Sequence, residues 1–131
     1  MTQLEEQKTE PHAGVGQLCI CEGFARVTEA PALASARWLG RADQAAAQDA
    51  ATSGMQHALE TMPIEGTIVL GAAEEGGVLT TGQQIGAGGR PVDLALDPLE
   101  GAGVVARGGS GAMTMIAVCL LYTSPSPRDR S

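Results

Sequence analysis

Apolar residues recur at helical spacing in the stretch that begins near residue 24. The apolar positions are Phe24, Val27, Ala34 and Trp38. With Gly40 as its C-cap, this pattern predicts a helix. Pro31 falls inside the stretch, where a proline removes a backbone hydrogen bond and costs about 3 kcal/mol. We therefore expect a break or kink at Ala30–Pro31, unless the helix begins there with Thr28 or Glu29 near its cap.

A second helix is predicted from about Gln44 to Thr61. Its start is rich in alanine, and one of its faces is apolar. That face consists of Ala51, Met55, Ala58, Leu59 and Met62. Pro63 follows directly and ends the helix, because a proline cannot continue the hydrogen-bond ladder.

Three shorter apolar runs predict strands. The segment "GTIVLG", residues 66–71, is a β-branched run bounded by glycines, which is typical of a buried strand. Further along, Val92, Leu94 and Leu96 alternate with other residues, so one side of that strand is expected to point inward. The segment "SGAMTMIAVCLL", residues 110–121, indicates another buried strand.

Two helices followed by strands predict an α/β or α+β fold with incomplete sheets. A long glycine-rich connection at 71–91 separates the first two strands. Residues 1–22 contain charge, proline and glycines without a sustained period, so we expect a poorly ordered arm there.

Composition and charge narrow the function classes. The chain has 131 residues, of which 44% are hydrophobic and 2% aromatic, which fits one domain with a core of small aliphatic side chains. Its formal net charge is −7, and without a basic patch this disfavours nucleic acids and anionic membranes. No stretch is long and apolar enough to cross a bilayer, and the polar N-terminus is no signal peptide, so we expect a cytoplasmic protein. Cys19, Cys21 and Cys119 lack paired spacing and are expected to be ordinary thiols.

The stretch "VDLALDPLEGA" carries the candidate chemistry. It places Asp97 and Glu100 at the end of the alternating run, where open α/β folds bind ligands. Two carboxylates and a carbonyl make a hard-oxygen site suited to Mg²⁺ or Mn²⁺. Pro98 fixes the backbone between these acids, and Gly101 permits close approach of the main chain to an anion. The alternative is that Asp97 and Pro98 merely open a turn and that Glu100 is solvated.

Three separated blocks carry a resemblance to a known family. They are "FARVTEAPALASARWLGRAD", "IEGTIVLG" and "VDLALDPLEG". In this order they resemble the N-terminal part of the class II fructose-1,6-bisphosphatases, which belong to the lithium-sensitive, metal-dependent sugar phosphatase superfamily. The resemblance implies that residues 23–118 are the N-terminal part of a layered α-β-α-β-α domain. Residues 119–131 lie outside the family pattern and are expected to be a disordered or artefactual tail, because its run of Ser, Pro and Arg cannot form a core.

The resemblance also implies roles for the acidic motif. Asp97 and Glu100 would be catalytic and would bind Mg²⁺ or Mn²⁺, with help from the backbone carbonyl of Leu99. Gly101 and Ala102 would offer backbone amides to the phosphate of the substrate, which Glu100 would also contact.

Other positions depart from the family pattern. The family has a metal-binding Glu after the first strand where this chain has Ala72, so Glu74 or Glu75 would have to substitute from a shifted loop. A metal-binding Asp of the second helix aligns with Gln48. The neighbouring Asp49 is turned by about 100° around the helix. A site with two remaining carboxylates should bind Mg²⁺ weakly.

Two hypotheses follow from the resemblance. The first is a phosphatase that removes the phosphate on carbon one of fructose 1,6-bisphosphate in gluconeogenesis, with a seven-carbon bisphosphate or an inositol phosphate as open alternatives and a homo-oligomer expected for the full-length family. The second is a degenerate, non-catalytic homologue or fragment that binds at most a sugar phosphate or a partner subunit, since the family's water-assisting Thr is Ala102 here. Family members are more than twice as long, so we expect the natural protein to continue. Without that part, strands should expose unpaired edges and apolar faces.

Overall fold

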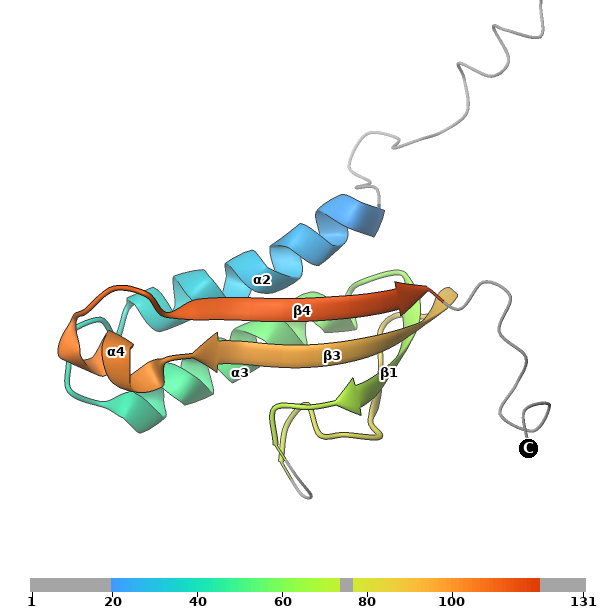
Figure 1. Cartoon of the computed structure of the whole chain (residues 1–131). Coiled ribbons are helices and arrows are strands. Elements are labelled where there is room, and N and C mark those ends of the chain that lie inside the picture. Colours follow the sequence, from blue (N-terminus) through green and yellow to red (C-terminus); the bar gives the residue numbers. More distant parts are fainter. Residues whose placement is uncertain (1–19, 74–76, 121–131) are drawn as a thin grey trace, which may run out of the picture.

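The computed structural model describes residues 20–73 and 77–120 as two layers, a sheet and the helices behind it (Figure 1). The helices are α2 (Ile20–Ala36), α3 (Gln44–Glu60) and α4 (Ala102–Arg107), and the strands are β1 (Ile64–Leu70), β2 (Gln84–Ile85), β3 (Arg90–Glu100) and β4 (Met113–Leu120). The sheet order is β2-β1-β3-β4. Strands β1 and β3 are parallel, whereas β2 and β4 run antiparallel to their neighbours. The fold is mixed α/β, as the sequence predicts.

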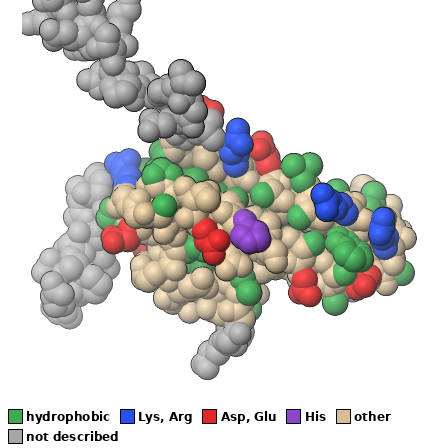
Figure 2. Space-filling view, turned by 180° about the vertical axis from the view of Figure 1, so that it is seen from behind, with side chains coloured by type: hydrophobic (Ala, Val, Ile, Leu, Met, Phe, Trp, Pro, Cys, Tyr) green, Lys and Arg blue, Asp and Glu red, His purple; other side chains and the backbone are tan. Residues whose placement is uncertain are grey.

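The core lies between the sheet and helices α2 and α3. Val92, Leu94 and Leu96 of β3 are buried as their alternation predicts, and they pack with Met55 and Leu59 of α3. The rest of this core cluster comprises Val27, Met62, Ile64, Ile68, Leu79 and Ile85. The outer surface of the two helices, seen from behind in Figure 2, carries acidic and basic side chains that are interspersed. Among the described residues, no helix combines the length and apolar character needed to cross a membrane.

Helix α2 runs without interruption through Pro31, so of the expected break or kink at Ala30–Pro31 the break is wrong, as is a helix that begins there. Pro31 is fully buried, and the turn of helix α2 that contains it packs directly against Gly54 of α3. A Cβ atom added to Gly54 would lie 3.0 Å from the carbonyl oxygen of Ala30 and 3.3 Å from the Cα atom of Pro31. The burial of the proline ring at this close contact offsets the missing backbone hydrogen bond.

The ends of α2 also differ from the prediction. The helix already includes Ile20, Cys21 and Glu22, which the sequence assigned to the arm. It ends at Ala36, so Trp38 lies in the following turn, where its backbone N–H donates to the carbonyl of Ser35 at 2.9 Å. Helix α3 matches the predicted segment closely and is capped by the Asp43 carboxylate, which accepts a hydrogen bond from the Ala46 amide.

Three other elements depart from the sequence expectations. The glycine-rich connection contains the short strand β2, and the segment after Gly101, for which no element was predicted, forms helix α4. Strand β4 lies at the edge of the sheet, and its residues are exposed or half-buried instead of buried. An apolar run by itself does not reveal whether a strand has neighbours on both sides, which explains this error.

The contact between Pro31 and Gly54 gives a stability prediction. We expect Gly54→Leu to lower the free energy of unfolding by about 1–3 kcal/mol, because the new side chain must push the two helices apart. Urea unfolding followed by circular dichroism measures this change. Ser53→Leu, at the exposed neighbouring position of α3, is the matched control and should change stability little. Equal effects of both substitutions would contradict the close helix contact.

Candidate functional site

A β-bulge brings Asp97 and Glu100 to the same face of the sheet. Side chains three positions apart in a regular strand point to opposite faces. Here Asp97 is the register partner of Met115 and Glu100 is the partner of Met113, with an irregularity in between. The three-residue step from Asp97 to Glu100 in β3 therefore lies opposite a two-residue step from Met115 to Met113 in β4. Residues two apart in a strand point to the same face, so Asp97 and Glu100 share a face as well. This is the face turned away from α2 and α3.

The two acids lie within the strand, whereas the sequence placed them after it. Strand β3 continues through Glu100, so no turn begins at Asp97 and Pro98, although Glu100 is exposed to solvent as that alternative expects. Pro98 is the residue in the sequence that indicates a bulge here, because a proline inside a strand is confined to edges and bulges. The bulge leaves Pro98 and Leu99 outside the register with β4.

The carboxyl groups of Asp97 and Glu100 interact directly. A side-chain hydrogen bond to Asp97, followed by the repulsion between the two charges and by desolvation, raises the pKa of Glu100 above its ordinary value of 4.5. Asp97 is half-buried and Glu100 is exposed. Two carboxylates held this close repel each other, and a proton or a cation between them relieves that repulsion.

Packing beneath the bulge holds the acidic pair in place. Leu99 is buried and belongs to a second apolar cluster. Its other buried members are Ala47, Ala51, Ala102 and Val105. Gly101 follows with φ of 101° as the N-cap of α4, and its carbonyl accepts hydrogen bonds from the amides of Val104 and Val105. A side chain at position 101 would be strained at this φ.

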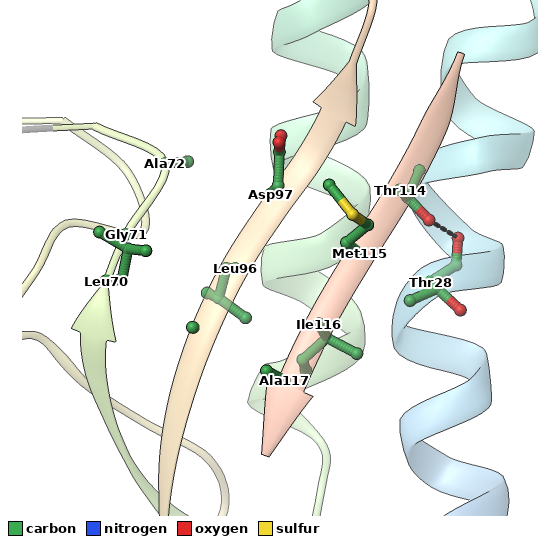
Figure 3. Close-up of a pocket in the computed structure, with 11 residues that line it drawn as sticks. Thr28, Leu70, Gly71, Ala72, Leu96, Asp97, Thr114, Met115, Ile116 and Ala117 are labelled. Carbon is green, nitrogen blue, oxygen red and sulfur yellow. Dashed lines mark hydrogen bonds between the residues drawn. The ribbon is translucent and has the colours of Figure 1, made fainter. Parts of the chain in front are cut away.

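A cavity of about 820 Å³ lies next to Asp97. Figure 3 shows Ala72, just beyond the end of β1, on one side of Asp97 and Met115 of β4 on the other. Ala72 presents a methyl group to this space, which cannot bind a cation. Thr114 and Thr28 line the far side, where the Thr114 hydroxyl donates to the Thr28 carbonyl at 2.9 Å.

Of the remaining metal-ligand candidates, the structure describes only Asp49, which does not join the acidic pair. Asp49 is exposed on α3 beside the half-buried Gln48, and Glu74 and Glu75 lie outside the described residues. Within residues 20–73 and 77–120, no group of three or more His, Cys, Asp or Glu side chains could hold a metal ion. Two carboxylates still match the donors of Mg²⁺ or Mn²⁺ sites in which phosphate and water complete the coordination. The two carboxylates therefore fit a metal ion that is also coordinated by phosphate and water, and not a site in which the protein supplies every ligand.

Comparisons with known proteins identify the family of the chain. The sequence family described as "Bacterial fructose-1,6-bisphosphatase, glpX-encoded" matches residues 19–122. The chain is 44% identical over 98 residues to "Fructose-1,6-bisphosphatase 1 class 2" of Escherichia coli (strain K12) and 42% identical over 97 residues to the class 2 enzyme of Haemophilus influenzae. It is 34% identical over 107 residues to "D-fructose 1,6-bisphosphatase class 2/sedoheptulose 1,7-bisphosphatase" of a Synechococcus species. These matches cover 72%, 72% and 70% of this chain but 29%, 29% and 31% of the relatives, so the chain spans less than a third of their length.

The acidic pair gives a pH prediction for the metal-free chain. Because the pKa of Glu100 is raised on folding, the folded chain binds this proton more tightly than the unfolded chain. The stability that it contributes is present below the ordinary pKa of 4.5 and is lost as pH rises through the raised value. We expect Asp97→Asn, which removes the repelling charge, to reduce this loss. Thermal melts at several pH values in the presence of a chelator measure this loss of stability.

Asp93→Asn is the matched control, because Asp93 lies on the same strand four positions earlier. This variant should keep the pH dependence of the unchanged chain over the same interval. Identical pH profiles for Asp97→Asn and the unchanged chain would contradict the coupling of the two carboxyl groups.

Proposed function

Because the chain belongs to the glpX-encoded family of bacterial fructose-1,6-bisphosphatases, we propose that it carries part of the active site of a metal-dependent phosphomonoester hydrolase. The reaction is removal of the phosphate on carbon one of fructose 1,6-bisphosphate, a step of gluconeogenesis. The family match confirms the resemblance drawn from the three sequence motifs. The observation that carries the proposal is the bulge that turns Asp97 and Glu100 to one face, in direct contact with each other.

The residues of the acidic motif have distinct roles in this proposal. Asp97 and Glu100, with the backbone carbonyl of Leu99, hold Mg²⁺ or Mn²⁺. The bound metal supplies Lewis-acid polarisation of the phosphoryl group and a more acidic water. Gly101 and Ala102 offer main-chain amides to the phosphate, and the positive φ of Gly101 allows the backbone to come close to it. Glu100 contacts both the metal and the substrate.

The substrate is a phosphorylated sugar, and an assay decides the number of its carbon atoms. The Synechococcus relative carries the names of both a six-carbon and a seven-carbon bisphosphatase, so sedoheptulose 1,7-bisphosphate is the second substrate to assay. The net charge of −7 disfavours nucleic acids and anionic membranes as partners. A cytoplasmic location and a homo-oligomeric full-length protein complete the proposal.

A second candidate is a non-catalytic homologue that binds a sugar phosphate or a partner subunit. The methyl group of Ala72 beside Asp97, and the lack of a third metal-binding acid among the described residues, favour it. The two candidates differ in whether the acidic pair binds a divalent cation.

A metal titration separates these candidates. We expect Mn²⁺ to bind the chain saturably and to raise its melting temperature, because a ligand that binds the folded state stabilises it. Asp97→Asn should weaken binding by about tenfold or more, since one of two charged ligands is lost, whereas Asp93→Asn should leave it unchanged. Calorimetry and thermal melts measure both effects. Absence of binding, or an equal loss with Asp93→Asn, would contradict a metal site at Asp97 and Glu100.

The methyl group of Ala72 provides a gain-of-function prediction. We expect Ala72→Glu to strengthen Mn²⁺ binding by about tenfold, because a third carboxylate raises the charge and ligand count of the site. Ala73→Glu adds the same charge at the next position and should strengthen binding much less. Release of inorganic phosphate from fructose 1,6-bisphosphate is then measured for each variant. No difference between the two substitutions would show that position 72 does not face the metal.

A further inference from the structure

The two methionines of β4 lie directly opposite the two acids of β3. Met115 is the register partner of Asp97, and Met113 is the partner of Glu100. Side chains that face each other across neighbouring antiparallel strands have Cβ atoms about 4.5–5.5 Å apart. Figure 3 shows Met115 and Asp97 on adjacent strands, and both residues line the cavity of about 820 Å³. Each carboxylate therefore has a thioether as its neighbour on the open face of the sheet.

These two methionines are also accessible to solvent. Met113 and Met115 are 52% and 42% exposed. The other methionines among residues 20–73 and 77–120 are Met55 and Met62, which are 0% and 5% exposed and belong to the core. A dissolved oxidant therefore reaches the sulfur atoms beside the acids much more easily than those of the core.

The acidic pair offers few oxygen ligands to a cation. Within the described ranges, no third His, Cys, Asp or Glu side chain joins Asp97 and Glu100 to form a metal-binding group. Mg²⁺ and Mn²⁺ prefer oxygen ligands, whereas a thioether is a soft ligand that suits other metals. Met113 and Met115 therefore add nothing to such a site in their reduced form. Oxidation changes this, because methionine sulfoxide carries a polar oxygen atom.

We propose that Met113 and Met115 form a modification site, at which hydrogen peroxide converts both thioethers to sulfoxides and the new oxygens become ligands of a divalent cation at Asp97 and Glu100. In each conversion the sulfur donates an electron pair to one peroxide oxygen, and the O–O bond breaks. The other oxygen leaves as water with both protons, so sulfur is oxidised and peroxide is reduced. This inference rests on the metal site proposed above.

The side chains can carry this change without loss of the fold. Methionine is unbranched and has three rotatable bonds, so a sulfoxide oxygen can turn toward the acid opposite it. Met113 and Met115 lie outside both apolar clusters, and a sulfoxide there remains in contact with water. At Met55 the same group would be buried without a hydrogen-bond partner, which is costly.

Limited treatment with hydrogen peroxide, followed by peptide mass spectrometry, tests where the chain is oxidised. We expect Met113 and Met115 to gain one oxygen atom about tenfold faster than Met55 and Met62, because of their exposure. Similar rates at the exposed and the buried methionines would overturn the proposal.

Calorimetric titration with Mn²⁺ before and after the treatment tests the consequence. We expect oxidation to tighten Mn²⁺ binding by about fivefold or more, because neutral oxygen ligands join the two carboxylates. The double variant with Met113→Leu and Met115→Leu keeps every cysteine and should show no gain, which separates methionine oxidation from cysteine oxidation. Methionine sulfoxide reductases should return the treated chain to its original affinity. Thermal melts verify that each form is folded.

Met115→Gln provides a test without oxidant, because it places a neutral amide oxygen where the sulfoxide oxygen would lie. It should tighten Mn²⁺ binding, whereas Met115→Leu, of similar size, should not. Equal affinities of these two variants, an affinity that oxidation leaves unchanged or lowers, or an equal gain in the double leucine variant would overturn the sulfoxide ligands alone. Absence of Mn²⁺ binding both before and after oxidation would overturn the metal site as well, so the two failures can be told apart.

Discussion

The burial of one face of strand β3 is the constraint on which the rest of the structure depends. Val92, Leu94 and Leu96 are buried beneath α2 and α3, and a slip of one residue would turn all three to solvent. This fixed register sets the pairing of β3 with β1 on one side and with β4 on the other. It also fixes where the strand leaves its regular alternation, which is at Pro98 and Leu99.

The irregularity at Pro98 connects the core to the candidate chemistry. Regular alternation would separate Asp97 and Glu100 onto opposite faces, whereas the bulge places them together and raises the pKa of Glu100. Leu99, which lies within the bulge, is buried in the second apolar cluster. The packing of its side chain therefore stabilises the bulge. The repulsion between the two carboxylates is thus maintained by apolar burial on the other side of the strand, which makes the pair suited to a divalent cation.

Among residues 20–73 and 77–120, helices cover only one face of the sheet. Two helices cover one face with a continuous core, while the acidic pair, Met113 and Met115 lie on the uncovered face near the free edge of β4. In the described part of the chain, the acidic pair and the outermost strand β4 therefore lie in the same region of the sheet.

The sequence by itself determined helix α3, the inward face of β3 and the presence of two acids near its end, because each follows from local periodicity and residue chemistry. The family motifs were also readable, and the comparisons confirm them. Only the tertiary structure decided that α2 continues through Pro31, since the compensating contact with Gly54 comes from another helix. It likewise decided that β4 is an edge and that Asp97 and Glu100 share a face. Both outcomes depend on strand register and on neighbours distant in sequence, which local patterns do not encode.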